Sequence, residues 1–345
     1  MRISLLKTTL IALVLGPELA HGAVGNNERL LNGDDAKKNE YPFMVRITAQ
    51  FDPNKDVYTV CGGAILDDNT ILSAAHCIQE AGMTDPIDAS QVKVGYGSVN
   101  TDKLKQVTVD KIIRHPDYKA EVTKLENDIS LLKLSDKLDW SDSTKPIKLC
   151  KVDLSDGDKL ISLGWGKTSG GQNAGLSDSL KEGEFTVDGP INYCKAQYSD
   201  YSSDNPSVLC FDASKNKQDI CSGDSGSPLI KKDDNNGELI VALDSYGAFK
   251  DTTAGSNATD TGTLARRNKF RRLCGKENTV NVFTRVGHFI DFIASTYNKS
   301  EDDLLSTTCG QPGVSGMQTS QAELQPSVYS TTVTLCILAT TIIVL

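Results

Sequence analysis

The sequence predicts an all-β protein, a sandwich or barrel, that ends in one helix. Between residues 41 and 284, short β-type runs alternate with turns rich in glycine, asparagine and aspartate, without an internal repeat of fixed period. Directly after this region the apolar residues change to a helical spacing. The β-type runs are Phe43–Thr48, Gly63–Leu66, Gln106–Val109, Ile129–Leu134, Lys159–Leu163, Glu238–Leu243 and Val280–Phe283.

The helical pattern covers residues 286–297. Its apolar residues lie on one stripe of a helix, so the pattern predicts an amphipathic helix packed against the β structure. These residues are Val286, Phe289, Ile290, Ile293 and Tyr297.

Composition excludes several classes of protein. The 345 residues are 39% hydrophobic and 23% charged, close to globular averages, which excludes a wholly disordered or collagen-like chain. The net charge of −9 argues against a broad surface for nucleic acid, because phosphate contacts need a cationic face. Nine cysteines indicate an oxidising compartment.

Residues 1–22 have the pattern of a secretory signal peptide. Basic residues precede the apolar stretch Thr8–Leu15, and the small residues Ala20 and Gly22 stand at suitable cleavage positions. The stretch is too short for a transmembrane helix, which needs about 20 apolar residues. The pattern therefore predicts secretion.

The C-terminal end has two parts. Residues 300–327 are rich in glycine, serine and glutamine and are expected to form a linker, whereas residues 328–345 form a short apolar tail without a following basic residue. Small residues, a polar spacer and a short apolar end are typical of a GPI-attachment signal. A marginal tail anchor or a sticky disordered tail are the alternatives. Removal of the tail with Cys336 would leave an even number of cysteines.

Three short segments carry candidate catalytic residues: Ser73–Cys77 contains His76, Asn127–Leu132 contains Asp128, and Gly223–Pro228 contains Ser225. A serine hydroxyl is a poor nucleophile until a base takes its proton, and a histidine oriented by a buried aspartate is such a base. Small residues around the serine allow backbone N–H groups to face a developing oxyanion. Taken singly, each motif also fits a surface histidine, a turn aspartate or an ordinary loop.

The order and context of these segments resemble the trypsin family of serine endopeptidases, which has the chymotrypsin fold. The order His, Asp, Ser differs from the orders in subtilisin-like enzymes and α/β-hydrolases. The resemblance covers roughly residues 29–297 and makes residues 30–299 one protease domain. Its further motifs are Tyr41-Pro-Phe, Cys61-Gly-Gly, His115-Pro-Asp-Tyr, Gly164-Trp-Gly, Ser245-Tyr-Gly and Val282-Phe-Thr-Arg-Val.

The resemblance implies two antiparallel six-stranded β-barrels, with the catalytic residues in the cleft between them and a C-terminal α-helix. It makes His76 the general base and then the general acid, Asp128 the residue that orients it, and Ser225 the nucleophile. The backbone N–H groups of Gly223 and Ser225 would form the oxyanion hole. Protein or peptide substrates and protease inhibitors are the implied partners of a monomer, and no cofactor is implied.

The resemblance also implies a specificity pocket. Asp219, six residues before Ser225, would bind an Arg or Lys side chain of the substrate, although a surface turn is the alternative for this aspartate. Ser245 and Gly247 would form the pocket wall and pair with the substrate backbone. Asn281 stands where trypsin-like members usually have glycine, and it could narrow the pocket.

Activation would follow the zymogen scheme of the family, with residues 23–29 as propeptide. Cleavage after Arg29 would free the amine of Leu30, which would pair with Asp224 and order the oxyanion hole. Because the expected pocket favours arginine, self-activation is one hypothesis.

Disulfides and modification sites complete the expectations. The resemblance implies disulfides Cys61–Cys77, Cys194–Cys210 and Cys221–Cys274, and Cys150 and Cys309 remain as a pair by elimination. Asn257 and Asn298 are N-glycosylation acceptors if they are exposed. The acidic calcium loop of some relatives is not recognisable around Gly95–Leu104, so no metal is expected.

An insertion relative to the family, residues 249–273, holds a basic cluster. It would be either a solvated loop that is easily cut or a lid or exosite for acidic partners.

Two rival hypotheses are a catalytically silent homologue that serves as a binding or inhibitor module, and a cell-surface structural protein. The presence of the complete triad and of Arg29 favours the enzyme.

Overall fold

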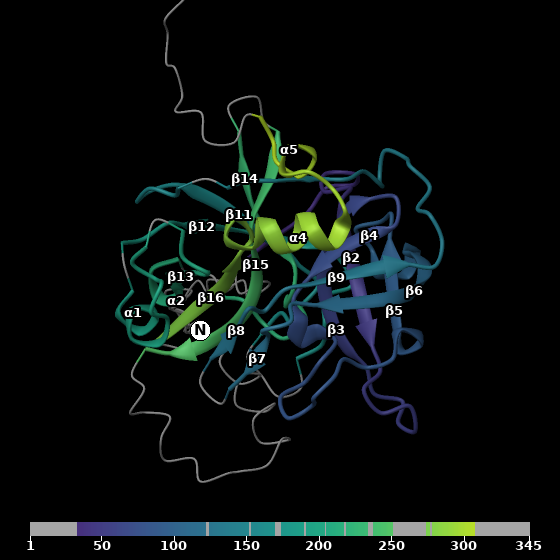
Figure 1. Cartoon of the computed structure of the whole chain (residues 1–345), viewed down its shortest axis with the longest axis horizontal. Coiled ribbons are helices and arrows are strands. Elements are labelled where there is room, and N and C mark those ends of the chain that lie inside the picture. Colours follow the sequence, from purple (N-terminus) through teal and green to yellow (C-terminus); the bar gives the residue numbers. More distant parts are fainter. Residues whose placement is uncertain are drawn as a thin grey trace, which may run out of the picture. The chain divides into compact units, whose positions relative to one another are not determined.

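A computed structural model describes residues 33–307, except for residues 122–123, 152, 170–173, 190, 204, 217–218, 234–236, 251–273 and 277. The expected signal peptide, the propeptide, the tail and most of the linker lie outside these residues and stay predictions. Figure 1 shows the described chain as two β structures, the earlier in purple and blue and the later in teal and green, with helix α4 (Ile290–Tyr297) between them. Among the described residues, no helix has the length and apolar character needed to cross a membrane.

The first β structure is a closed barrel of six strands, joined in the order β2-β3-β4-β9-β6-β5 by antiparallel pairing. Apolar side chains alternate inward along its strands, so that Ile47, Ile71 and Leu132 are completely buried. The strands are β2 (Met44–Ala49), β3 (Thr59–Asp67), β4 (Thr70–Ser73), β5 (Val92–Tyr96), β6 (Lys105–Arg114) and β9 (Ser130–Leu134).

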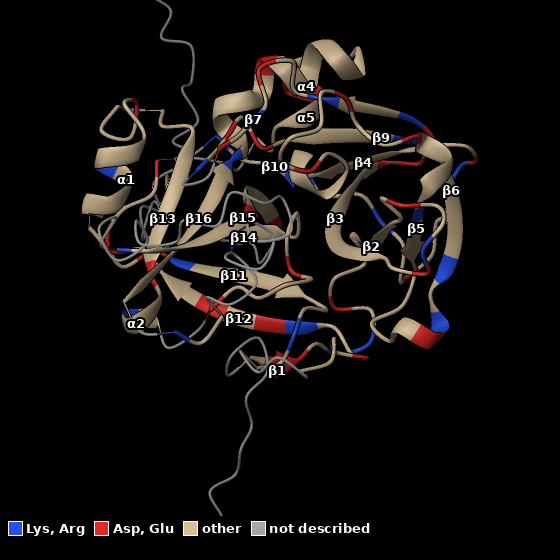
Figure 2. Cartoon of the chain, turned by 90° about the horizontal axis from the view of Figure 1, so that it is seen from below, with Lys and Arg blue, Asp and Glu red and all other residues tan. Residues whose placement is uncertain are grey.

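The second β structure is an eight-stranded sheet in the order β1-β12-β11-β14-β15-β16-β13, with β10 parallel to β15 off this path. Its strands are β1 (Asp34–Asp35), β10 (Lys148–Leu149), β11 (Lys159–Gly164), β12 (Lys181–Thr186), β13 (Val208–Asp212), β14 (Pro228–Lys232), β15 (Glu238–Phe249) and β16 (Thr279–Arg285). Figure 2 shows that β16 carries few charged residues, whereas β12 carries both signs.

The six strands from β11 to β16 follow the same sequential order as the strands of the barrel. In both structures the first strand lies between the second and the fourth, and the sixth lies between the third and the fifth. Among the described residues, however, no pairing joins β12 to β13, so hydrogen bonds do not close the second structure. The all-β prediction is confirmed. The first β structure is a closed barrel, and the second is a sheet whose strands follow the same order without closing.

Each predicted β-type run overlaps a strand, and β15 extends beyond its run to Phe249. The predicted helix over 286–297 is shorter as an α-helix, because Val286–Phe289 form a 3₁₀ segment, η5, ahead of α4. Asn298 ends α4 with a φ of 54°, a left-handed conformation that asparagine tolerates. The remaining described elements are η1 (Ala75–Cys77), η2 (Ala89–Gln91), η3 (Thr101–Lys103), β7 (Lys119–Ala120), β8 (Leu125–Glu126), α1 (Asn192–Gln197), α2 (Ala213–Asn216) and α5 (Glu301–Leu304).

Helix α4 packs against both β structures. Ile290 and Ile293 belong to one buried apolar cluster with Leu72 and Leu131 of the barrel and with Leu243 of the second sheet. The helix therefore packs the two halves against one another.

The second sheet has its own aromatic core. The rings of Phe185, Phe211 and Phe283 meet edge to face, with centroids 5.2–5.6 Å apart. Edge-to-face contact suits the aromatic quadrupole and adds to the free energy gained by burial.

We expect Phe211→Ala to lower the free energy of unfolding by about 3–5 kcal/mol, because it leaves a cavity among these rings. Urea denaturation followed by circular dichroism, on a Ser225→Ala background that removes the candidate nucleophile, measures this change. Trp140→Ala is the matched control, since Trp140 is 50% exposed and its loss should change the same free energy by less than about 0.5 kcal/mol. Equal effects of the two substitutions would contradict the assignment of the core.

Candidate active site

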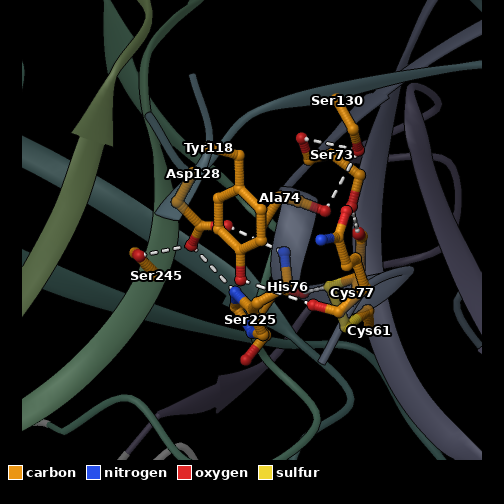
Figure 3. Close-up of a disulfide and its surroundings, with 12 residues drawn as sticks. Cys61, Ser73, Ala74, His76, Cys77, Tyr118, Asp128, Ser130, Ser225 and Ser245 are labelled. Atoms are coloured by element: carbon orange, nitrogen blue, oxygen red, sulfur yellow. Dashed lines mark hydrogen bonds and ion pairs between the residues drawn. A yellow bond between two sulfur atoms is a disulfide. The ribbon is translucent and has the colours of Figure 1, made fainter. Parts of the chain in front are cut away.

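The carboxylate of Asp128 holds His76 in a fixed orientation. Asp128 Oδ2 accepts a hydrogen bond from His76 Nδ1 at 2.8 Å, and Oδ1 accepts from the His76 backbone N–H at 2.9 Å. Ser245 Oγ donates to the same Oδ2 at 2.5 Å (Figure 3). Because a carboxylate only accepts hydrogen bonds, the Nδ1 atom is the donor in this pair, and Nε2 is left for another partner.

Asp128 stays ionised although its side chain is 1% exposed. Burial alone would raise its pKa, but the charge of His76 and the hydrogen bonds from His76 and Ser245 outweigh burial and hold the pKa below its usual value. The local backbone supports this placement, since Asn127 takes a left-handed φ of 53° and donates its side-chain amide to the Asp117 carbonyl oxygen. Asp128 is therefore directed inward at the start of β9.

Ser225 lies in a turn that the surrounding backbone holds tightly. The Gly62 N–H donates to the Ser225 carbonyl oxygen at 2.8 Å, and the Gly226 N–H donates to the Asp244 carbonyl oxygen at 2.7 Å. Gly226 has a φ of 78°, and a Cβ there would come within 2.3 Å of Ser73 Oγ. Only glycine fits this position, which fixes the turn against the barrel.

Two backbone donors beside Ser225 have no acceptor in the described part of the chain. Neither the Gly223 N–H nor the Ser225 N–H donates to an oxygen of the described residues, and both residues line the same cleft. An oxyanion hole requires unoccupied donors of this kind.

The carboxylate of Asp224 is buried behind the turn. It accepts hydrogen bonds from the backbone N–H groups of Gly166 at 2.7 Å and Cys221 at 2.9 Å. A Cβ at Gly166 would come within 2.4 Å of this carboxylate, and one at Gly164 within 1.9 Å. The Gly-Trp-Gly motif thus leaves room for a buried acid.

No lysine or arginine in the described ranges pairs with Asp224. Burial raises its pKa to about 7, and the two N–H bonds lower it only in part. This carboxylate lacks a cation partner in the part of the chain that the structure describes.

Part of the candidate site lines a cleft of about 320 Å³ at the junction of the two halves. His76, Ser225, Ser245 and Gly247 contribute to its wall. No hydrogen bond joins Ser225 Oγ to His76 among the described residues, and such bonds often tighten only when substrate binds. Further lining residues that the sequence interpretation missed are Tyr58, Glu80, Tyr118, Glu121, Lys167 and Leu176.

The expected specificity residues lie next to this cleft. Asp219 is 5% exposed, and its Oδ2 accepts from the Gly275 N–H at 2.7 Å. Burial raises its pKa to about 7, partly offset by the Gly275 N–H and the nearby Asn281 amide. Asn281 itself is completely buried, and neither of its side-chain polar atoms makes a hydrogen bond of regular geometry to the described residues. Asp219 is thus a buried acid, not a surface turn residue.

A further buried acid, Asp244, was missed in the sequence. It is completely buried between β14 and β16, and Ser162 Oγ donates to its Oδ2 at 3.0 Å. Burial and the charge of Asp224 raise its pKa well above the usual value. The signal that could have found it is an acid directly after the apolar run Ile240–Leu243.

The disulfides Cys61–Cys77, Cys194–Cys210 and Cys221–Cys274 are formed, the same pairs that the resemblance implied. Cys150 is also disulfide-bonded, but Cys309 lies outside the described residues, so that pairing stays a prediction. Arg29, Leu30 and Asn257 likewise lie outside the described residues, and so does most of the 249–273 insertion. Asn298 is exposed, as glycosylation requires.

One group of side chains has the composition of a metal site. Possible ligand atoms of Cys61, His76 and Cys77 lie within 4.8 Å of one another. Because the two cysteines are joined in a disulfide, they offer no thiolates, and the group does not fit a metal ion.

Comparison with known proteins agrees with this geometry. A family model described as Trypsin matches residues 30–293. Anionic trypsin of Canis lupus familiaris is 28% identical over 282 residues, which cover 79% of this chain and 90% of that protein. Granzyme B of Rattus norvegicus is 28% identical over 299 residues, covering 84% and 98%. Trypsin-1 of Astacus astacus is 32% identical over 208 residues, covering 59% and 83%.

We expect the uncleaved Ser225→Ala precursor to lose free energy of unfolding as the pH rises from about 4 to about 7. Asp219 and Asp224 have folded-state pKa values raised to about 7, so their contribution to stability is fully present below their unfolded pKa and is lost as the pH approaches 7. Urea denaturation at several pH values measures the slope, which is about 1.4 kcal/mol per pH unit for each proton bound only by the folded state.

Asp244→Asn tests the same reasoning. The amide keeps an acceptor for Ser162 but does not titrate. The slope of the free energy of unfolding against pH should therefore become shallower, by less than the slope that one bound proton contributes. A precursor whose stability is constant or rises over this pH range would contradict the assignment of these buried acids.

Proposed function

The chain belongs to the trypsin family of serine endopeptidases, and we propose that Ser225, His76 and Asp128 form its catalytic triad, with cleavage after Lys or Arg. The observation that carries the proposal is the Asp128–His76 pair at 2.8 Å in the same cleft as Ser225. This arrangement supplies a nucleophile, a base and a group that orients the base.

The triad would act in two acyl-transfer steps. Ser225 Oγ attacks the scissile carbonyl carbon while His76 Nε2 takes the hydroxyl proton, and the tetrahedral intermediate then expels the amine, which receives that proton from His76. Water attacks the resulting ester with His76 again as the base, and Ser225 recovers its proton. Asp128 remains charged and stabilises the imidazolium through its bond to Nδ1.

The free N–H groups of Gly223 and Ser225 are suited to the negative charge that develops on the carbonyl oxygen. Donors already directed at that position cost no reorganisation during the reaction, and one such donor is worth about 10²–10³ in rate.

Asp219 supports a preference for basic side chains. A carboxyl group that is 5% exposed and lacks a cation among the described residues would gain from a bound Lys or Arg head group. The cation would restore the charged form of a carboxyl whose pKa is otherwise raised to about 7.

Asp224 supports activation from a zymogen. Its buried carboxylate accepts two backbone N–H bonds and lacks a cation in the described ranges. The α-amine of Leu30, freed by cleavage after Arg29, would provide that cation. The amine exists only after cleavage, so the ion pair would be a covalently triggered switch next to Ser225.

We further propose that the enzyme is secreted, that Asn298 carries a glycan, and that the C-terminal tail is a GPI-attachment signal. The leader pattern, the exposure of Asn298 and the apolar end of the sequence support these proposals. Protein or peptide substrates and protease inhibitors are the partners that this function implies.

Cleavage at Arg29 should switch on the nucleophile. The precursor carrying Arg29→Gln should react with a fluorophosphonate at least about 10²-fold more slowly than processed enzyme, because its oxyanion hole is not ordered. Fluorescence of the labelled band over time measures the rate, and Ser225→Ala is the control that should not label.

Labelled enzyme should hydrolyse Lys or Arg esters in preference to phenylalanine and alanine esters. Failure of the processed protein to label at Ser225 would instead support the hypothesis of a catalytically silent binding module.

The tail proposal has its own test. Phosphatidylinositol-specific phospholipase should release the protein from the surface of expressing cells, since a GPI anchor is its only link to the membrane. Resistance to the enzyme together with a mature protein that retains Leu345 would refute the proposal. A variant that stops after residue 327 is the control and should appear in the medium without treatment.

A further inference from the structure

We propose that Asn281 makes the enzyme selective for lysine over arginine, so that it does not activate its own precursor at Arg29 and depends on a separate arginine-cleaving protease. This inference rests on the proposed function and specifies the substrate class of the same site.

Asn281 lies directly behind the wall of the cleft. In the pairing of β15 with β16, Asn281 stands directly opposite Gly247, which lines the cleft. Paired residues of an antiparallel ladder project to the same face of a sheet, so the Asn281 side chain occupies the space beside Gly247. Glycine there adds no competing side chain.

The amide of Asn281 has unused hydrogen-bonding capacity. The residue is completely buried, and both Nδ2 and Oδ1 lack a regular partner within the described residues. Leaving a buried polar group unpaired costs about 1–3 kcal/mol, and native proteins contain few such groups. An amide retained at this cost next to a binding cleft is explained if a ligand that reaches the end of the cleft supplies the missing partner.

The Asp219 carboxylate lies close enough to the Asn281 amide for that amide to favour its charged form. An amide N–H is the part that can favour a carboxylate, so Oδ1 remains as an acceptor. The two side chains together therefore offer several acceptors and a negative charge, which suits a head group with several N–H donors.

The cleft ends before it reaches this pair. Ile220, Cys221 and Ser222 line it, whereas neither Asp219 nor Asn281 does. The Asn281 side chain fills space that a glycine would leave open, which makes the pocket shallower. A substrate head group must therefore meet its acceptors within a smaller volume.

Lysine and arginine differ in how well their head groups fit a shallow pocket. The ammonium of lysine is compact, and its three donors rotate on a flexible stem, whereas the guanidinium of arginine is a wide, rigid plane with five donors. The ammonium fits a shallow floor and can donate to both Asn281 Oδ1 and the carboxylate. The guanidinium would leave donors unpaired or collide with the amide.

This selectivity bears on activation. The residue before the new N-terminus is Arg29, which the proposed pocket disfavours. The precursor would then be the substrate of a hydrolase that accepts arginine, and self-activation would be slow.

The test uses processed enzyme whose activation does not depend on its own cleavage at Arg29. A recognition sequence for an unrelated protease replaces residues 23–29, so that cleavage leaves Leu30 as the N-terminus, and fluorophosphonate titration of Ser225 counts active sites. We expect kcat/KM for a lysine peptide amide to exceed that for the matched arginine amide by at least about tenfold. Asn281→Gly should raise kcat/KM for arginine by a similar factor and abolish the preference.

Two further measurements test the effect of side-chain size at residue 281 and the effect on cleavage of the precursor. Asn281→Ser, which is smaller but still polar, should fall between the wild type and Asn281→Gly. Wild-type enzyme should cut the Ser225→Ala precursor slowly at Arg29 and at least about tenfold faster when that precursor also carries Arg29→Lys. Asn281→Gly enzyme should cut both precursors at comparable rates.

The failures are distinguishable. Wild-type enzyme that cleaves arginine substrates as fast as lysine substrates, or an Asn281→Gly variant that changes both equally, overturns the selectivity alone. Enzyme that fails to label, or that labels and cleaves neither substrate, overturns the proposed function together with it.

Discussion

The buried carboxylate of Asp128 is the contact on which the site depends, because it joins the two halves of the molecule. It stands at the edge of the first barrel and binds His76 there, while Ser245 from β15 of the second sheet donates to the same oxygen. Thr284 of β16 also donates to the Asp128 carbonyl oxygen at 3.1 Å. Hydrogen bonds to a buried charge are worth about 1.5–3 kcal/mol each, so a shift of either half would cost both catalytic geometry and stability.

The second half of the molecule differs from the Asp128 site, because its buried acids have no cation partner among the described residues. Asp219, Asp224 and Asp244 are each at most 5% exposed, and burial raises the pKa of each. When all three groups ionise, each adds an unpaired buried charge and lowers the free energy of unfolding. The arrangement is explained if cations arrive later, one from the substrate at Asp219 and one from the new N-terminus at Asp224.

The resemblance of the sequence to a known family predicted the disulfides Cys61–Cys77, Cys194–Cys210 and Cys221–Cys274, and the structure forms all three. The candidate residues His76 and Ser225 come from two short segments far apart in the sequence, and the fold places both at one cleft, with Asp128 bonded to His76. The sequence marks Asp244 only as an acid after an apolar run, and its neighbours Ser162 and Asp224 could not be predicted, since only the fold brings them together. The first turn of the predicted C-terminal helix was also wrong as α-helix, because residues 286–289 follow β16 directly and form a 3₁₀ segment. Local periodicity does not distinguish these two helices.

Two of these buried acids are each one peptide bond from a serine of the candidate site. Asp224 precedes Ser225, and Asp244 precedes Ser245, the hydrogen-bond donor to Asp128. The two segments are also bonded to one another, since the Gly226 N–H donates to the Asp244 carbonyl oxygen and the Asp244 N–H donates to the Ser227 carbonyl oxygen. These bonds would couple a change of charge at either acid to both the proposed nucleophile Ser225 and the proposed base His76. This coupling gives a physical reason why a single new amine at Asp224 could order the whole site.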